Sequence, residues 1–224
     1  MIDTKDMRLP IHTLGIGTSW LLSMIVLIWW GCGHMWREPR KKKRQSISSM
    51  YRGAPPKMKV DKLPYYLQID KRWRKVKLGH TNETLAAVGC TLSCTAMAMA
   101  RYGYTLNPKQ LNQKLKKHKG FTQRGWLIWS GIHRVSKGRL RVVTPKRPTH
   151  RMILSQLALK NPVIAKIKLN NWSVHWVLIV GKRGRDYLIK DPLDSKKKIR
   201  LLSEYRSDIY SIRWIEKIAG TSKS

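Results

Sequence analysis

Apolar residues are arranged along this chain in three ways, and each arrangement predicts a different kind of structure. Residues 11–36 contain no Asp, Glu, Lys or Arg, and an uncharged apolar stretch of roughly 20 residues is long enough to span a bilayer as a helix. Residues 91–100 carry small and apolar side chains at helical spacing, which predicts a buried helix. Residues 173–180 are apolar on both faces except at His175, which predicts a central strand.

The N-terminal apolar stretch is interpreted as a retained membrane-spanning segment, residues 1–36. A basic run, R-E-P-R-K-K-K-R at residues 37–44, follows it directly, and the positive-inside rule then places the C-terminal body on the cytoplasmic side. A body facing the envelope or a virion membrane is the other orientation. A cleaved secretory signal would carry its charge before the apolar core. A lipoprotein cleavage site at Cys32 and a buried core helix are further alternatives, the former weakened by the two tryptophans that precede Gly31.

The remaining chain divides into a basic flank and linker at residues 37–62, one globular domain at residues 63–217, and a tail at residues 218–224. Ser, Pro and Gly in the polar stretch after the basic run favour the linker interpretation. Within the domain, helices are expected at residues 91–100, 109–119 and 149–159, with an apolar segment at 126–135. Strands are expected at residues 139–143, 163–169, 173–180, 186–190, 199–202 and 209–215. The expected fold class is therefore α+β, with a helical part packed against an antiparallel sheet.

The net charge of the chain is extreme, at +34. Residues 1–44 contain 8 Lys/Arg and 3 Asp/Glu, so the body keeps a net charge of about +29. Such a surface attracts polyanions, including nucleic acid, anionic lipid and acidic cell-wall polymers. The three cysteines form no disulfide framework, and no other Cys or His lies at metal-ligand spacing near Cys90 and Cys94. We therefore expect no metal and no cofactor.

Cys90 is the candidate nucleophile because it lies at the start of the predicted buried helix, directly after Gly89. The unpaired N–H groups and the macrodipole of a helix N-terminus lower the pKa of a thiol. A small buried cysteine without a chemical role is the alternative, and on the local sequence alone it is favoured. Partners further along the chain change that balance.

The predicted hairpin of residues 173–190 supplies such partners. A symmetric turn centred near Arg183 places His175 opposite Asp191, and paired residues of an antiparallel hairpin share a face. A carboxylate that accepts from one imidazole nitrogen fixes the tautomer and leaves the other nitrogen free to take a thiol proton. Cys90, His175 and Asp191 thus form a constellation typical of cysteine peptidases. A purely structural His–Asp pair is the alternative.

Several short segments of the body come in a characteristic order: Y-L-Q-I-D-K-R-W at residues 66–73, L-G at 78–79, G-C-T-L at 89–92, A-M-A-M at 96–99, Y-G at 102–103, Pro108, P-V-I at 162–164, H-W-V at 175–177, Gly181 and D-P at 191–192. In this order they resemble the papain-fold cysteine peptidases related to the bacteriocin-processing, double-glycine leader peptidases, over about residues 63–217. The resemblance implies that Cys90 is the nucleophile, His175 the general base and acid, and Asp191 the orienting carboxylate. It also implies that Gln68 donates to the oxyanion together with the Cys90 backbone N–H.

The residues around the nucleophile depart from the resemblance, because leader-processing members usually have Asp-Cys-Gly where this chain has Gly89-Cys90-Thr91. The double-glycine substrate therefore does not carry over. Three functions remain open. The first is a membrane-anchored cysteine peptidase acting on a peptide or protein. The second is an envelope- or virion-associated hydrolase of peptidoglycan peptides or amides. The third is a catalytically inert basic membrane protein that binds nucleic acid or anionic lipid.

Overall fold

The structure is a computed structural model that describes residues 46–53, 57–170 and 172–219. Among these residues, no helix combines the length and the apolar character needed to cross a bilayer. The predicted membrane segment at residues 1–36 and the basic run after it lie outside the described residues, so the membrane interpretation stays a prediction.

The described helices are α2 (Leu85–Val88), α3 (Cys90–Ala100), α4 (Pro108–Lys117), α5 (Ser130–Val135), α6 (His150–Ala158) and the 3-10 turn η1 (Leu202–Tyr205). Local chemistry explains where they begin. The side chain of Asn107 accepts from the Gln110 N–H in a capping box and Pro108 occupies the first turn of α4. The Thr149 side chain accepts from the Met152 N–H at the start of α6.

The described strands are β1 (Met58–Lys59), β2 (Leu140–Val143), β3 (Val163–Leu169), β4 (Ser173–Arg183), β5 (Asp186–Lys190), β6 (Arg200–Leu201) and β7 (Ser211–Lys217). They form one sheet with the order β2-β7-β3-β4-β5-β6, and β1 pairs with β4. Every pairing is antiparallel. The expectation of an α+β fold with an antiparallel sheet is therefore confirmed.

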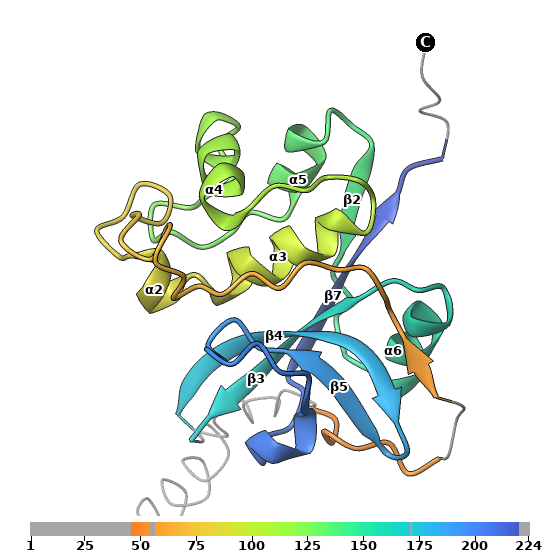
Figure 1. The fold of residues 1–224 in the computed structure, drawn as a ribbon. Helices are drawn as coiled ribbons and strands as arrows, with labels where there is room; N and C mark the ends of the chain where they lie inside the picture. Colours follow the sequence, from red (N-terminus) through yellow and green to blue (C-terminus); the bar gives the residue numbers. More distant parts are fainter. Residues whose placement is uncertain (1–45, 54–56, 171, 220–224) are drawn as a thin grey trace, which may run out of the picture. The chain divides into compact units, whose positions relative to one another are not determined.

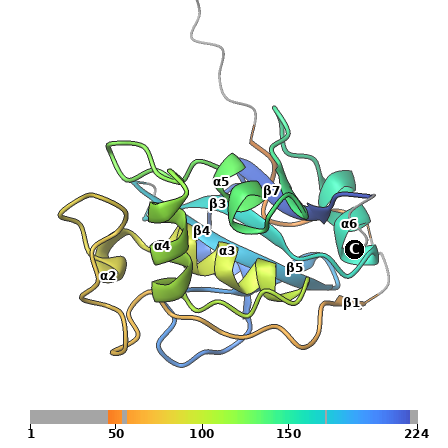
Figure 2. The ribbon, with the colours of Figure 1, turned by 90° about the horizontal axis from the view of Figure 1, so that it is seen from above.

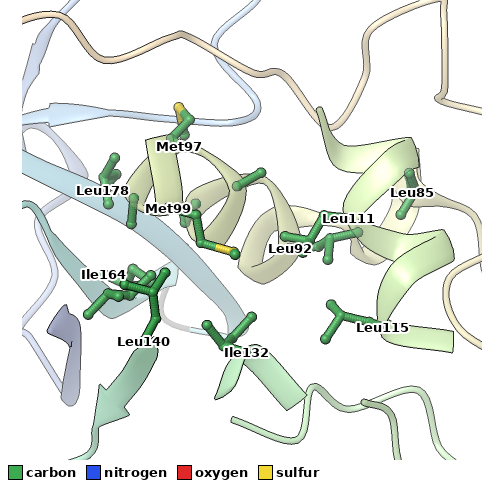
Figure 3. Close-up of a cluster of buried hydrophobic side chains, with 14 of the residues drawn as sticks. Leu85, Leu92, Met97, Met99, Leu111, Leu115, Ile132, Leu140, Ile164 and Leu178 are labelled. Carbon is green, nitrogen blue, oxygen red and sulfur yellow. The ribbon is translucent and has the colours of Figure 1, made fainter. Parts of the chain in front are cut away.

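The sheet is covered on both faces, and the alternation of β3 shows which side chains serve which face. Ile164 belongs to the apolar cluster that includes α3, α4 and α5, whereas Val163, Ala165 and Ile167 belong to a second cluster with α6. Figures 1 and 2 show α3 lying along the sheet with α4 and α5 beyond it. Figure 3 shows the first cluster, in which the side chains of α3 meet those of α4 and of the sheet. Helix α3 is almost wholly buried, as its uncharged sequence predicts.

The segment expected to be a linker, residues 37–62, pairs with the folded body in its described part. In its described part, Ile47 pairs with Ile209, Met50 pairs with Asp186, and β1 pairs with β4 around Gly181. Apolar side chains explain the contact, since Val60 is 4% exposed and Ile47 and Met58 pack against the second cluster. A polar composition favoured a free linker, but alternating apolar residues within it attach to the sheet.

Candidate active site

Cys90 is the first residue of α3, and Gly89 makes this position available. Gly89 ends the short helix α2 with its N–H donating to the Leu85 carbonyl. A Cβ on Gly89 would lie 2.4 Å from that carbonyl oxygen, so the two helices can join this closely only through glycine. The φ of Gly89 is −82°, so close approach, and not a left-handed backbone, requires the glycine. Cys90 is therefore at the N-terminus of a buried helix, as predicted.

The hairpin that brings His175 and Asp191 together has a different register from the predicted one. Leu178 pairs with Lys190, Arg183 pairs with Asp186, and a bulge lies between Ile179 and Gly181. Continued beyond β5, this register places Asp191 two residues from the position opposite His175. A shift of two residues keeps a side chain on the same face of a sheet. The symmetric pairing around Arg183 was wrong, yet His175 and Asp191 still meet as diagonal neighbours.

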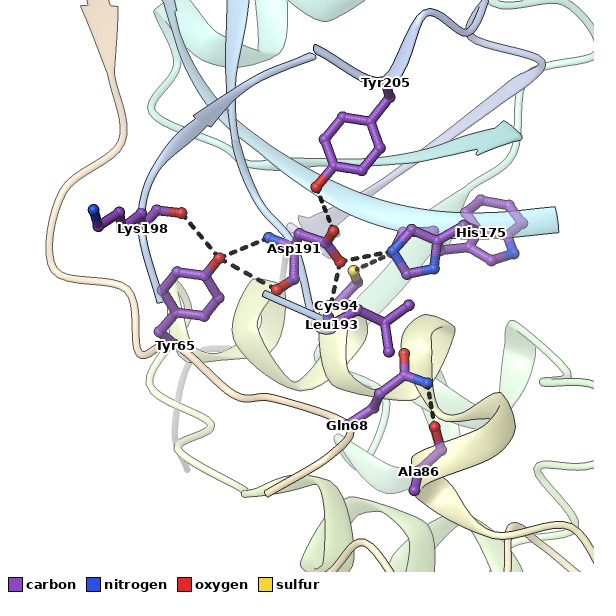
Figure 4. A network of polar contacts seen from close by, with 10 residues as sticks. Tyr65, Gln68, Ala86, Cys94, His175, Asp191, Leu193, Lys198 and Tyr205 are labelled. Carbon is purple, nitrogen blue, oxygen red and sulfur yellow. Dashed lines mark hydrogen bonds and ion pairs between the residues drawn. The ribbon is translucent and has the colours of Figure 1, made fainter. Parts of the chain in front are cut away.

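The His175–Asp191 pair is buried, and both carboxylate oxygens of Asp191 accept hydrogen bonds (Figure 4). The His175 Nε2 lies 2.7 Å from Asp191 Oδ1, and the two side chains are 3% and 6% exposed. The Leu193 N–H also donates to Oδ1, at 2.8 Å, and the Tyr205 hydroxyl donates to Oδ2. These bonds, with the charge of His175, overcome the burial that would raise the pKa of Asp191 and hold that pKa below its ordinary value. Asp191 is thus an oriented carboxylate.

Tyr65 forms hydrogen bonds with the backbone of Asp191. Its hydroxyl accepts from the Asp191 N–H at 2.9 Å and lies 3.2 Å from the Asp191 carbonyl and 3.1 Å from the Lys198 carbonyl, to either of which it can donate. Burial raises the pKa of Tyr65 well above its usual value, so the phenol stays protonated. Sequence reasoning missed both Tyr65 and Tyr205. Neither lies in a local pattern that indicates a hydrogen bond to a residue 126 or 14 positions away.

Cys90 and His175 lie close enough for each to shift the pKa of the other. Burial alone would raise the pKa of the Cys90 thiol, but the hydrogen bond and charge of His175 outweigh it and bring the pKa below its usual value. Burial likewise disfavours a charged imidazole, yet the bonds to Asp191 and Cys90 raise the pKa of His175 to about 9. Both shifts favour a thiolate beside an imidazolium. Because Nε2 faces Asp191, the other ring nitrogen is the one available to the thiol.

Cys94 lies one helical turn after Cys90 but in a different environment. It is fully buried and its thiol donates to the Trp176 carbonyl at 3.4 Å. Burial, together with the negative charges of Cys90 and Asp191, raises the pKa of Cys94 well above its ordinary value. The two cysteines of α3 therefore lie in different environments, which shift their pKa values in opposite directions.

Gln68, the predicted oxyanion donor, is 2% exposed. Its Nε2 donates to the Ala86 carbonyl of α2 at 2.7 Å, and its backbone N–H donates to the Pro192 carbonyl at 2.9 Å. Figure 4 shows its side chain beside α2, in the same region as the His175–Asp191 pair. One N–H of the amide remains after the bond to Ala86, and Oε1 has no partner among the described residues. The oxyanion role of Gln68 stays a prediction. In the described part of the chain, no group of His, Cys, Asp and Glu is arranged to hold a metal ion.

A family model described as the Peptidase C39 family matches residues 85–213, more than half of the chain. A crystal structure described as a C39-like peptidase from Bacillus anthracis has a TM-score of 0.45 and 14% sequence identity, and the match covers 72% of this chain and 98% of that one. No curated protein matches. The residues matched by the family model include Cys90, His175 and Asp191 but not Gln68.

Proposed function

Because the chain belongs to the Peptidase C39 family, we propose that it is a cysteine peptidase whose catalytic residues are Cys90, His175 and Asp191. The observation that carries the proposal is the environment of His175, which binds a buried carboxylate and whose pKa and that of Cys90 shift each other. A structural His–Asp pair needs no thiol at this place. A thiol with a lowered pKa beside a histidine with a raised one is the arrangement of an activated nucleophile.

The geometry supports an acyl-transfer mechanism. The Cys90 thiolate attacks the carbonyl carbon of the scissile peptide bond, and the His175 imidazolium gives its proton to the leaving amine as the C–N bond breaks. An acyl-enzyme thioester remains. His175, now neutral, takes a proton from water, which attacks the thioester and regenerates the thiolate–imidazolium pair. Asp191 keeps the imidazole in one tautomer and stabilises its charged form. We assign Gln68 and the Cys90 N–H to the developing oxyanion.

Selective alkylation tests the assignment without knowledge of the substrate. Iodoacetamide or an E-64-type epoxide is added at pH 6, where an ordinary thiol is almost fully protonated, and labelled peptides are mapped by mass spectrometry. Cys90 should react and Cys94 should not, so each protein molecule contains its own control. His175→Ala should abolish labelling at pH 6 while circular dichroism shows a retained fold. Equal labelling of both cysteines, or labelling independent of His175, would contradict the proposal.

Membrane attachment is the second part of the proposal and is supported by the sequence alone. An uncharged stretch at residues 11–36 followed by the basic run at 37–44 fits a single-pass anchor with the body on the cytoplasmic side. Protease protection in sealed vesicles tests the orientation. A cytoplasmic body is protected in right-side-out vesicles and digested in inverted ones, whereas a body on the opposite side gives the reverse result. A body outside the cytoplasm would favour peptidoglycan peptides or amides as substrate, and release of the chain by carbonate would refute the anchor.

The charge of the body favours one further partner class, polyanions. With a net charge of about +29 outside residues 1–44, the body should bind anionic lipid, nucleic acid or acidic cell-wall polymers with an affinity that falls steeply as salt rises. If the alkylation test fails and this affinity is strong, an inert basic membrane protein becomes the better account. Weak binding that does not depend on salt would exclude a polyanion partner.

A further inference from the structure

A cavity of about 600 Å³ opens beside the candidate nucleophile. Its lining includes Thr91, the residue after Cys90, and both Val174 and Trp176, the neighbours of His175 on β4. A volume of this size lies within the range of sites that hold a small molecule or several side chains. The mechanism proposed above uses Cys90 and His175, the chain neighbours of these lining residues, and gives the cavity itself no role.

The walls of the cavity are aromatic. Trp126 and Trp129, from the loop before α5, line it together with Trp176 of β4. The rings of Trp129 and Trp176 pack edge to face with centroids 6.0 Å apart. Trp126 is 67% exposed and Val174 is 55% exposed. Large apolar side chains gathered at an open cavity lose contact with water when an apolar group enters. An aromatic or large aliphatic side chain is the occupant that these walls fit.

The charges around the cavity have one sign. Arg124 and Lys166 belong to its lining, and no described Asp or Glu does. Arg213 lies behind the aromatic wall, with its guanidinium carbon 5.7 Å from the centroid of Trp129 and 5.9 Å from that of Trp176. Its Nε is buried and has no hydrogen-bond partner among the described residues. A basic residue of the substrate would be repelled here, whereas a carboxylate would be attracted.

We propose that this cavity is a specificity subsite that binds an apolar or aromatic substrate side chain with an acidic residue next to it, close to the scissile bond. The inference rests on the proposed function, since it places the cavity beside a reacting carbonyl at Cys90. It names a substrate class for the same site: acidic, aromatic-containing peptide segments.

Binding of defined peptides to Cys90→Ala protein tests the subsite without requiring turnover. The probes are four fluorescein-labelled peptide amides of one Ala/Gly sequence, with Phe or Ala at one central position and Glu or Lys beside it. Anisotropy at 0.15 M salt gives their dissociation constants. The Phe–Glu peptide should bind at least about tenfold more tightly than the Ala–Glu peptide, because burial of a Phe side chain supplies that factor or more. The Ala–Glu peptide also measures non-specific attraction to the basic surface.

Matched variants then locate the binding. Trp126→Ala should remove most of the Phe-dependent difference, and its exposed side chain can be truncated without loss of the fold. Trp172→Ala is the control, because Trp172 is 87% exposed and lies outside the lining. Arg124→Gln should reduce the preference for Glu over Lys severalfold. Lys117→Gln, which also removes one positive charge but at an exposed position of α4, should not.

Three results would overturn the inference: equal affinity for all four peptides, a Phe-dependent difference that survives Trp126→Ala, or an equal effect of Trp172→Ala. These results are separate from failure of the proposed function. A protein that binds the Phe–Glu peptide through Trp126 but shows no selective alkylation of Cys90 has the subsite without the peptidase chemistry. A protein with selective alkylation and no Phe-dependent binding has the chemistry without the subsite.

Discussion

Replacement of Asp191 by Asn removes a charge from the site while keeping its shape. The Leu193 N–H donates to Oδ1, the atom that also accepts from His175, so an Asn side chain is held with its oxygen toward both donors. The Tyr205 hydroxyl can accept from the new amide group in place of donating to Oδ2. The imidazole therefore keeps its tautomer and orientation, and the change isolates the electrostatic contribution of the carboxylate.

The magnitude follows from the nature of the bond that is lost. A hydrogen bond to an ionised partner is about twice as strong as a neutral one, which corresponds to a difference of roughly 1.5 kcal/mol. That amount equals about one pKa unit. The pKa of His175, raised to about 9 by its bonds to Asp191 and Cys90 against burial, should fall to about 8. The imidazolium is then less favourable by the same amount, so the fraction of thiolate–imidazolium pairs should fall by up to about tenfold.

The rate of Cys90 alkylation between pH 4 and pH 10 measures both effects. In the native protein, the ion pair exists above the lowered pKa of Cys90 and is lost when His175 gives up its proton near pH 9. For Asp191→Asn, the rate at pH 6 should fall by up to about tenfold and the alkaline transition should move down by about one pH unit. Asp61→Asn, at a 60% exposed side chain paired with Lys59, is the matched control. An unchanged profile in folded Asp191→Asn protein would refute the orienting role of the carboxylate.

Three further changes probe the neighbouring structure. Tyr205→Phe removes a hydrogen bond to the buried Asp191 carboxylate and should lower the free energy of unfolding by about 1.5–3 kcal/mol in urea titrations; a change below 0.5 kcal/mol would mean that the bond is not formed. Gly89→Ala brings a Cβ to 2.4 Å from the Leu85 carbonyl oxygen and should cost about 1–3 kcal/mol in the same assay, with unchanged stability as the contrary outcome. Gln68→Ala should reduce kcat by roughly 10²–10³ while alkylation of Cys90 at pH 6 continues; loss of alkylation as well would point to a structural role.

Strand positions in the body could be predicted from the sequence because local chemistry determines them. The expected strands at residues 163–169 and 186–190 coincide with β3 and β5. Each has apolar residues at strand spacing and is bounded by a proline dipeptide, Asn161-Pro162 before β3 and Asp191-Pro192 after β5. Helix α4 ends two residues before the predicted boundary, because His118 is its C-cap and Lys119 takes a positive φ of 49°. The proposed nucleophile at a helix start and histidine on a strand needed only these local signals.

The hairpin register could not be predicted, because a distant segment participates in it. The bulge lies between Ile179 and Gly181, where β1 pairs with β4. A Cβ on Gly181 would lie 2.5 Å from the Met58 carbonyl oxygen, so the glycine serves the approach of a segment about 120 residues earlier in the chain. The structure of the apolar segment at residues 126–135 could not be predicted from its local sequence either. Only α5, at the C-terminal end of this segment, is helical. Trp126 and Trp129 of the same segment line the cavity because of where the loop before α5 lies relative to β4.

The long-range contacts converge on one connection between the beginning and the end of the body. Tyr65 binds the backbone of Asp191, the Gln68 N–H donates to the carbonyl of Pro192, and Lys190 Nζ donates to the Leu63 carbonyl at 2.5 Å. The same short stretch of chain therefore positions both the carboxylate that faces His175 and the amide assigned to the oxyanion. These two groups lie far apart in sequence, and no local pattern at either one indicates the bonds that connect them.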